Sequence, residues 1–164
     1  MELEDRIINH FHSAMDVNAH TIEQYTPLIA HASEVLLHCL ASEGKILCVG
    51  NGASAALAQH FCSLLVNRFR TERPGLPAMN LAADSSSLTA IIEDISFSDV
   101  YSKQISAFGQ PNDVLIMATS HGKASSLVQA IQAAHDREMQ VILLNGSDGG
   151  DVTALLRPDE VEIC

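Results

Sequence analysis

The first residues in this sequence that are suited to chemistry follow an apolar run at residues 46–49. Gly50-Asn51-Gly52 ends this run, and Ala53 and Ser54 open a stretch of small, helix-forming residues. This order predicts a buried strand, a tight turn and a helix start, because glycine reaches backbone angles that other residues avoid. The Ser54 hydroxyl and the free N–H groups of the first helical turn then face the same space. With the positive end of the helix dipole behind them, they are suited to bind an anion such as phosphate.

A second loop of the same kind, residues 119–126, follows the continuous apolar run at residues 114–118. It begins with Thr119, Ser120 and His121, and a glycine and a lysine come directly after them. The hydroxyls and the N–H groups of the helix expected to follow predict a second anion site, to which the histidine and lysine would add positive charge. Ordinary capping of that helix by serine or threonine is the alternative explanation.

Two better-known phosphate motifs do not fit the first loop. Residues 50–55 match the G-x-G-x-x-A form of the dinucleotide-binding fingerprint, but that fingerprint also needs an acidic residue about 20 positions further on. The nearest candidate, Asp84, lies well beyond that distance and follows a proline-rich segment. A P-loop is excluded because no Gly-Lys-Ser or Gly-Lys-Thr follows the turn. A dinucleotide is therefore the less favoured ligand.

His60 lies two turns into the helix expected at about residues 54–69 and is the candidate metal ligand of the sequence. A metal site on a helix commonly uses a second ligand one turn later. That position is Leu64, with Ser63 beside it, and neither side chain binds a metal strongly or moves a proton at neutral pH. A structural histidine is the simpler interpretation.

Apolar runs alternate with helical periodicity along most of the chain, which predicts strands and helices in turn. Strands are expected at residues 46–49, 78–81, 114–118, 141–144 and 161–164. Helices are expected at residues 54–69, 86–92 and 98–108, after the loop at residues 119–126 up to about residue 137, and near residues 151–156. Strands that are apolar throughout belong to a parallel sheet covered on both faces. We therefore predict an α/β fold with a doubly wound, five-stranded parallel sheet.

Two amphipathic helices are expected before the first strand, at residues 3–20 and 27–42. They are separated by a break at Thr26-Pro27, and Gly44 is expected to stop the second one. Two long helices exceed what one small sheet needs for cover. Their spare apolar surface leads to the hypothesis of a subunit interface.

Ligands of such sheets bind outside the carboxyl ends of the strands, at the point where the strand order reverses. Three polar loops fall at these ends, residues 50–54, 84–87 and 119–126. They supply hydroxyls and backbone donors with almost no fixed charge. That composition favours a phosphorylated, hydroxyl-rich ligand such as a sugar phosphate.

Composition narrows the class of protein further. With 164 residues, 47% of them hydrophobic, the chain is long enough for one globular core, and no apolar run approaches the length of a membrane span. The net charge of −11 argues against a nucleic-acid-binding surface. The acidic N-terminus lacks the basic start of a secretory signal, and four scattered cysteines indicate reduced thiols. A cytoplasmic protein is the simplest expectation.

Several of these segments together resemble one known family. The matching segments are Cys48–Ser54, His60-Phe61, residues 67–69 and 72–78, Glu93-Asp94 and residues 146–150. They are similar, in this order, to the sugar isomerase (SIS) domain family and most of all to its phosphoheptose isomerase branch. The resemblance implies a doubly wound, flavodoxin-like SIS sheet over residues 45–164 and an oligomerising helical pair over residues 1–44. The family continues past the fifth strand with a C-terminal helix that has no counterpart in this sequence.

The resemblance further implies a homotetramer and a sugar phosphate bound at the loops already described. The implied ligand-binding positions are Asn51, Gly52, Ala53, Ser54, Asp94, Thr119, Ser120 and His121. In the isomerases, a zinc-binding histidine is followed four residues later by a glutamate on the same helix. His60 matches the histidine, but Leu64 occupies the position of the glutamate.

A second functional type of this branch binds the replication initiator DnaA and lacks that glutamate. Isomerisation needs a general base next to a carbonyl, and losing such a group costs about 10²–10⁴-fold in rate. Leu64 therefore leads us to expect a non-catalytic, sugar-phosphate-binding protein without a cofactor that binds DnaA and promotes replication initiation. The alternatives are an active sedoheptulose 7-phosphate isomerase, for which zinc would be the expected metal, and a sugar-phosphate-binding regulator with another partner.

Overall fold

The sheet of the computed structural model, which describes residues 2–146 and 149–164, has five parallel strands in the order β2-β1-β3-β4-β5. Its strands are β1 (Ile46–Gly50), β2 (Ala78–Asn80), β3 (Val114–Thr119), β4 (Gln140–Asn145) and β5 (Val161–Ile163). The predicted α/β class and the doubly wound parallel sheet are confirmed. Each predicted strand is present within one or two residues of its expected bounds.

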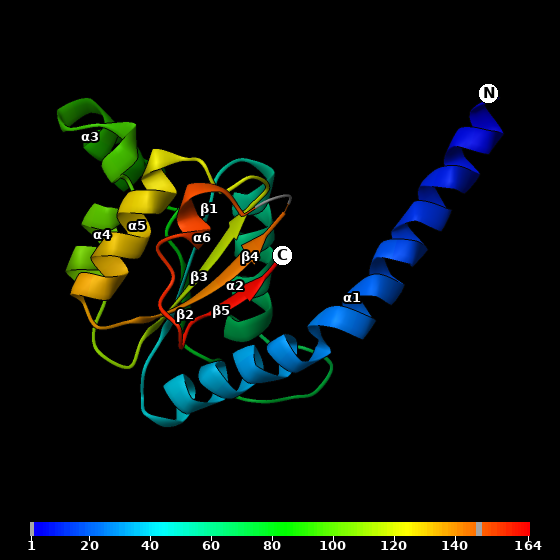
Figure 1. Ribbon diagram of the computed structural model, residues 1–164. Coiled ribbons are helices and arrows are strands. Elements are labelled where there is room, and N and C mark those ends of the chain that lie inside the picture. The colour runs from blue at the N-terminus through cyan, green and yellow to red at the C-terminus, as the bar shows by residue number, and fades with distance from the viewer. Residues whose placement is uncertain (1, 147–148) are drawn as a thin grey trace.

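Helices cover both faces of this sheet (Figure 1). They are α1 (Leu3–Ala41), α2 (Ala53–Val66), α3 (Ser85–Asp94), the 3₁₀ turn η1 (Phe97–Asp99), α4 (Ser102–Phe108), α5 (Ser125–Asp136) and α6 (Gly150–Thr153). Successive strand residues point to opposite faces. Leu47 and Val49 accordingly join the core under α4 and α5, whereas Ile46 and Cys48 join the core under α1 and α2. Apolar residues at every position of β1 are therefore required by burial on both sides.

The N-terminal segment differs from the expected pair of helices, because α1 is one helix of 39 residues with Pro27 inside it. Proline lacks an N–H group and its ring crowds the preceding turn, so it bends a helix without always ending it. Figure 1 shows α1 bent in its middle, and Thr26 Oγ1 donates a hydrogen bond to the carbonyl of Ile22 at 2.6 Å. Beyond Pro27, Ala32 and Cys39 are buried against the sheet. This packing holds the second half of the helix in place.

The end of α1 corrects the role expected for Gly44. The residue in the left-handed conformation is Glu43, with φ of 60°, and the Gly44 N–H donates to the carbonyl of Cys39 at 2.9 Å. Gly44 is needed for close packing instead, because a Cβ there would lie 2.6 Å from the carbonyl oxygen of Asn112. The last turn of α5 is built in the same way, with Glu138 at φ of 58°.

Replacing Glu138 with glycine is expected to stabilise the chain by about 0.5–1 kcal/mol, since a left-handed conformation costs a residue with a Cβ about 1–2 kcal/mol. Urea unfolding of the variant measures this gain. The matched control is Glu138→Ala, which removes the same carboxylate and keeps the Cβ. An equal gain in both variants would show that charge, and not backbone conformation, is responsible.

No helix in the described part of the chain combines the length and the apolar character that crossing a membrane requires.

Candidate functional site

A cavity of about 260 Å³ opens at the carboxyl ends of β1 and β3. These two strands are neighbours in the sheet, yet the chain leaves β1 toward β2 on one side and β3 toward β4 on the other. The loops after them diverge and leave a crevice, as expected where strand order reverses. The cavity is lined by Asn51, Ser54, Thr119, Ser120, His121, Lys123 and Ala124. The two polar loops singled out in the sequence thus form one site.

Two larger cavities have a different character. One of about 490 Å³ lies at the amino ends of the strands, beside Glu34, Glu138 and Asp159, and therefore disfavours an anion. The other, of about 780 Å³, is a mainly apolar groove between α1 and the last strands. Each of these two cavities has at least one carboxylate among its lining residues, whereas the described lining of the 260 Å³ cavity combines hydroxyl, amide and cationic groups without one.

The two helices that begin at the cavity have no side chain capping their N-termini. Gly52 precedes α2 and Ala124 precedes α5, and neither residue supplies an acceptor for the first N–H groups. By contrast, α3 is capped by Asp84, whose carboxylate accepts hydrogen bonds from the N–H groups of Ser86 and Ser87. Uncapped N–H groups and the helix dipole attract an anion. The N-termini of α2 and α5 are therefore suited to a phosphate, and that of α3 is not.

Asp84 also explains why the loop at residues 84–87 does not join the site. Its carboxylate accepts hydrogen bonds from the Ser87 hydroxyl and from backbone N–H groups, and these bonds lower the pKa of Asp84. No residue of the loop at residues 84–87 lines the 260 Å³ cavity. The sequence indicates helix-capping residues in this loop, and here the capping is intramolecular.

Asn51 is held by a network that ties the two loops together. The hydroxyl of Tyr101 is 2.5 Å from the carbonyl oxygen of Gly50 and 3.0 Å from Asn51 Oδ1. Asn51 Nδ2 donates to the hydroxyl of Ser126 at 3.1 Å. Tyr101 and Ser126 are buried, and burial raises the pKa of the Tyr101 hydroxyl, which stays a proton donor at neutral pH. This network fixes the orientation of Asn51 toward the cavity.

The second loop is shaped by its own polar groups. The N–H of Gly122 donates to Thr119 Oγ1 at 3.1 Å, which closes a tight turn after β3. Ser120 Oγ lies 2.9 Å from Nδ1 of His121. His121 and Lys123 are exposed at the cavity and are the only residues with ionisable side chains among the seven that line it. Among the residues that the structure describes, no carboxylate lines this cavity, which favours an anionic ligand.

Not all of the predicted site residues line the cavity. Gly52 and Ala53 lie beside it at the start of α2, whereas Asp94 is an exposed residue at the C-terminal end of α3. His60 is exposed further along α2, and Leu64 is half-buried. Sequence reasoning missed the positioning role of Tyr101, because a buried tyrosine beyond the next helix carries no local pattern that links it to residue 51.

The zinc site implied by the resemblance does not fit these residues. His60 has no ligand at the position one turn later, where Leu64 stands. Within residues 2–146 and 149–164, no group of three or more histidine, cysteine, aspartate or glutamate side chains is arranged to hold a metal ion.

The fold is that of a doubly wound α/β protein, with a polar crevice suited to an anion where the strand order reverses. The model of the SIS domain family matches residues 9–146. This chain belongs to the SIS domain family.

Similar proteins narrow the comparison to one branch. A phosphoheptose isomerase of Chromohalobacter salexigens is 48% identical over 99% of this chain and 83% of its own length. One of Alkalilimnicola ehrlichii is 45% identical with the same coverage. The structure of a phosphoheptose isomerase from Francisella tularensis superimposes with a TM-score of 0.95 at 38% identity, over 99% of this chain and 85% of that one.

These comparisons correct the function expected from the sequence. The expectation of a non-catalytic protein that binds DnaA is wrong, because the relatives that align along nearly the whole chain are named phosphoheptose isomerases. They support the alternative of an isomerase. Similarity along the whole sequence outweighs the absence of a glutamate at position 64.

Proposed function

We propose that this protein is a phosphosugar isomerase that interconverts a ketoheptose and an aldoheptose phosphate, with sedoheptulose 7-phosphate as the ketose. The main observation that supports this proposal is the cavity at the carboxyl ends of β1 and β3. Its hydroxyls, cationic side chains and uncapped helix N-termini suit a sugar phosphate. Similarity to phosphoheptose isomerases at 45–48% identity supports the reaction class.

In this proposal the N-termini of α2 and α5 bind the phosphate, together with the hydroxyls of Ser54, Thr119 and Ser120. Asn51, held by Tyr101 and Ser126, contributes an amide whose position is fixed before the ligand arrives. Isomerisation moves a proton from C1 of the open-chain ketose to C2, while a proton leaves the hydroxyl on C1 and another joins the oxygen on C2. Fixed binding groups favour this step by holding the reacting carbons in one orientation.

The direct test is turnover of sedoheptulose 7-phosphate by the purified chain, followed by NMR of the aldose product and by solvent deuterium entering C2. We expect conversion that is slow but clearly above the uncatalysed rate. Binding of the sugar phosphate without any conversion or deuterium entry would contradict the proposed reaction. It would leave a binding protein as the remaining interpretation.

Replacing Leu64 with glutamate is expected to raise the rate constant for turnover about tenfold. Residues 60 and 64 lie on one face of α2, and the resemblance assigns a carboxylate general base to the second position. An introduced carboxylate that the surrounding residues do not orient should recover only part of the usual 10²–10⁴-fold effect. The matched control is Leu64→Gln, which has similar size and polarity without a proton acceptor. Equal rates in both variants would exclude residue 64 as a site of proton transfer.

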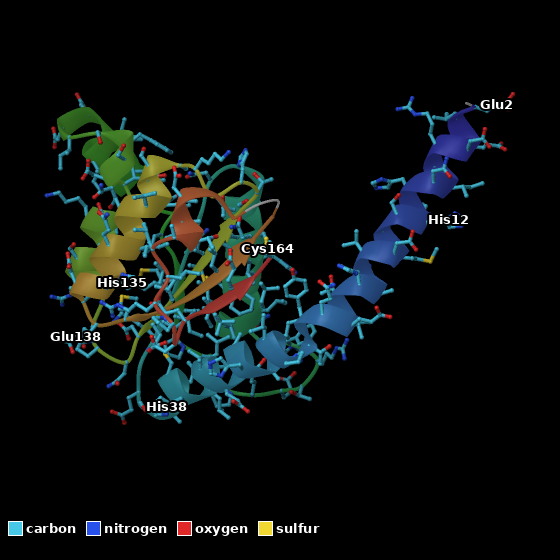
Figure 2. The ribbon with its side chains drawn as sticks, in the orientation of Figure 1. Glu2, His12, His38, His135, Glu138 and Cys164 are labelled. Carbon is cyan, nitrogen blue, oxygen red and sulfur yellow. The ribbon has the colours of Figure 1, made fainter. Side chains whose placement is uncertain are left out.

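We also propose that α1 mediates self-association into a homo-oligomer. Seven large apolar side chains of its first half are half or more exposed, namely Leu3, Ile7, Ile8, Phe11, Met15, Val17 and Ile22. Figure 2 shows this half, with Glu2 and His12, projecting away from the body. An apolar surface of this extent on a charged protein is typical of a protein–protein interface. A homotetramer is the assembly that the family resemblance implies.

Light scattering of the chain after size exclusion tests this proposal. The double variant Ile8→Asp with Phe11→Asp is expected to convert the oligomer into monomers, since two buried charges would oppose association. The control is Asn18→Asp, a charge added at another exposed position of the same helix half. A monomeric wild type would contradict the proposal.

A further inference from the structure

His121 is a cavity residue that the proposed isomerase chemistry does not yet use. It lines the cavity together with Lys123, four residues before the start of α5. Its ring nitrogen Nδ1 is 2.9 Å from the hydroxyl oxygen of Ser120. A hydroxyl can turn to donate to a neutral imidazole or to accept from a protonated one. Ser120 therefore supports His121 in either protonation state.

Among the residues that the structure describes, the carboxylate near the turn of His121 is that of Glu162, which lies beside Gly149 and accepts a hydrogen bond from the hydroxyl of Thr153. No acidic residue lies in the first turn of α2 or of α5, and Lys123 is on the same loop. The start of α6 packs against the backbone of His121, where a Cβ on Gly150 would lie 2.3 Å from its carbonyl oxygen. The acidic residue in that turn, Asp151, is exposed to solvent. A phosphate bound in the cavity would add negative charge beside the imidazole.

We propose that His121 selects the dianion of a phosphate monoester by taking up a proton as the sugar phosphate binds. This inference rests on the proposed function and adds a specificity-determining residue to it. Histidine is the side chain that changes charge near neutral pH, and a negative charge within about 4–6 Å favours its protonated form. The proton that enters the site gives His121 a charge-assisted hydrogen bond to the phosphate.

The sign of the pH dependence follows from this proton uptake. Because the complex holds more protons than its separate components, a rise in pH weakens binding. One proton corresponds to at most about a tenfold loss of affinity for each pH unit. A neutral sugar of the same shape gains nothing from this proton, so selectivity for the phosphorylated sugar is greatest at the acidic end of the neutral range.

Isothermal titration calorimetry with sedoheptulose 7-phosphate measures the uptake directly. The full chain is titrated near pH 7 in two buffers whose ionisation enthalpies differ, and the difference in binding heat gives the number of protons taken up. The variants are His121→Asn and His121→Gln, which keep a hydrogen-bonding side chain without a proton to gain. The control is His31→Asn, an exposed histidine on α1 beside the opposite edge of the sheet.

On binding, the wild type and His31→Asn should each take up roughly half a proton or more in excess of the uptake by either His121 variant. This is the uptake expected when a phosphate dianion binds beside an imidazole near neutral pH. Near pH 7 the free phosphate monoester is already mostly a dianion, because its second pKa is about 6, so its own ionisation adds little to the uptake by any of the four proteins. The His121 variants should bind about tenfold more weakly, because a charge-assisted hydrogen bond is lost. Equal proton uptake in wild type and His121 variants would overturn the inference alone. Failure of the wild type to bind the sugar phosphate would overturn the proposed function, and this inference with it.

Discussion

Replacing Gly122 with alanine is expected to destabilise the chain by about 3 kcal/mol or more and to weaken sugar-phosphate binding more than about 100-fold. Gly122 has φ of 57°, and a Cβ there would lie 1.9 Å from the carbonyl oxygen of Gly149. The carbonyl of Gly122 also accepts a hydrogen bond from the N–H of Val152 at 3.1 Å. The turn after β3 is therefore packed directly against the start of α6.

Affinity for the sugar phosphate is lost because the turn after β3 must move to make room for the new Cβ. A Cβ at position 122 has to push the turn away from α6, and Ser120 and His121 move with it because they are its nearest neighbours in the chain. Groups that bind a ligand in a fixed geometry lose about 100-fold for a displacement of roughly 1 Å. Calorimetric titration with sedoheptulose 7-phosphate and urea unfolding measure the two effects on the same protein.

Gly52→Ala is the matched control for the stability change. Gly52 has the same φ of 57°, but a Cβ there would meet no atom within 4 Å. This variant bears only the conformational cost of a left-handed alanine, about 1 kcal/mol. The difference between the two variants isolates the packing of the β3 turn against α6. Similar losses of stability in both would show that this packing is loose.

The sheet could be predicted from the sequence because its signal is local and strong. Residues 46–49 and 114–118 are apolar at every position, as burial on both faces requires, and each run ends in glycine, serine or threonine. Parallel strands of this kind also imply where a ligand binds, since their carboxyl ends meet at one edge. That Asn51 and Thr119 line one cavity is therefore predictable from the sequence.

Features set by distant contacts were not predictable in the same way. Pro27 suggested a helix break, but packing of the following residues on the sheet keeps α1 continuous. The loop at residues 84–87 was expected to supply hydroxyls and backbone donors to the ligand site, but its N–H groups are bound by the Asp84 carboxylate that caps α3. Tyr101 reaches Asn51 across 50 residues, which only the assembled core determines. In each case the deciding contact lies outside the local pattern.

The function was not predictable from one position for a related reason. The chemistry of Leu64 alone does not decide between an enzyme and a binding protein. The position lies on the helix that starts at the cavity, but its side chain is not among those that line it. A single substitution outside the cavity lining affects the rate of a reaction more directly than the kind of reaction that the site performs.

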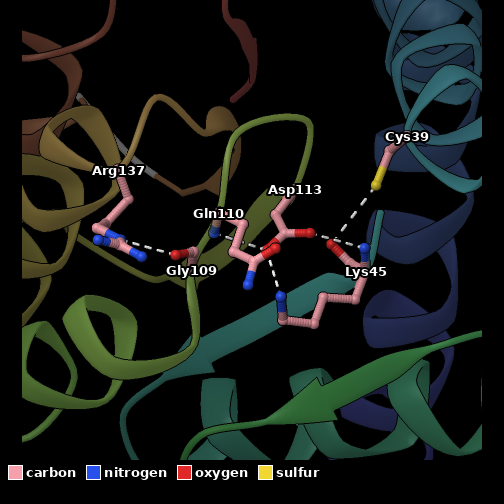
Figure 3. Close-up of polar contacts among 6 residues, drawn as sticks. All are labelled: Cys39, Lys45, Gly109, Gln110, Asp113 and Arg137. Carbon is pink, nitrogen blue, oxygen red and sulfur yellow. Dashed lines mark hydrogen bonds and ion pairs between the residues drawn. The ribbon is translucent and has the colours of Figure 1, made fainter. Parts of the chain in front are cut away.

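Replacing Asp113 with alanine is expected to destabilise the chain by about 3–5 kcal/mol, the largest loss that we predict for stability alone. Figure 3 shows Asp113 between the start of β1 and the loop before β3. Its carboxylate lies 2.5 Å from Lys45 Nζ and accepts hydrogen bonds from the N–H groups of Lys45 at 2.8 Å and Gln110 at 2.9 Å. The Asp113 side chain is only 3% exposed, so these donors would be left without an acceptor.

Lys45→Met separates the ion pair from the backbone hydrogen bonds. The Lys45 side chain is 29% exposed, and its removal leaves both N–H donors on the Asp113 carboxylate. We therefore expect a smaller loss of about 1–2 kcal/mol. The double variant should cost less than the sum of the two single variants, because the two residues share one interaction. Urea unfolding measures all three, and a loss below about 1 kcal/mol for Asp113→Ala would contradict this account. Because Asp113 lies at the amino end of the sheet, opposite the cavity, each folded variant should bind the sugar phosphate as tightly as the wild type.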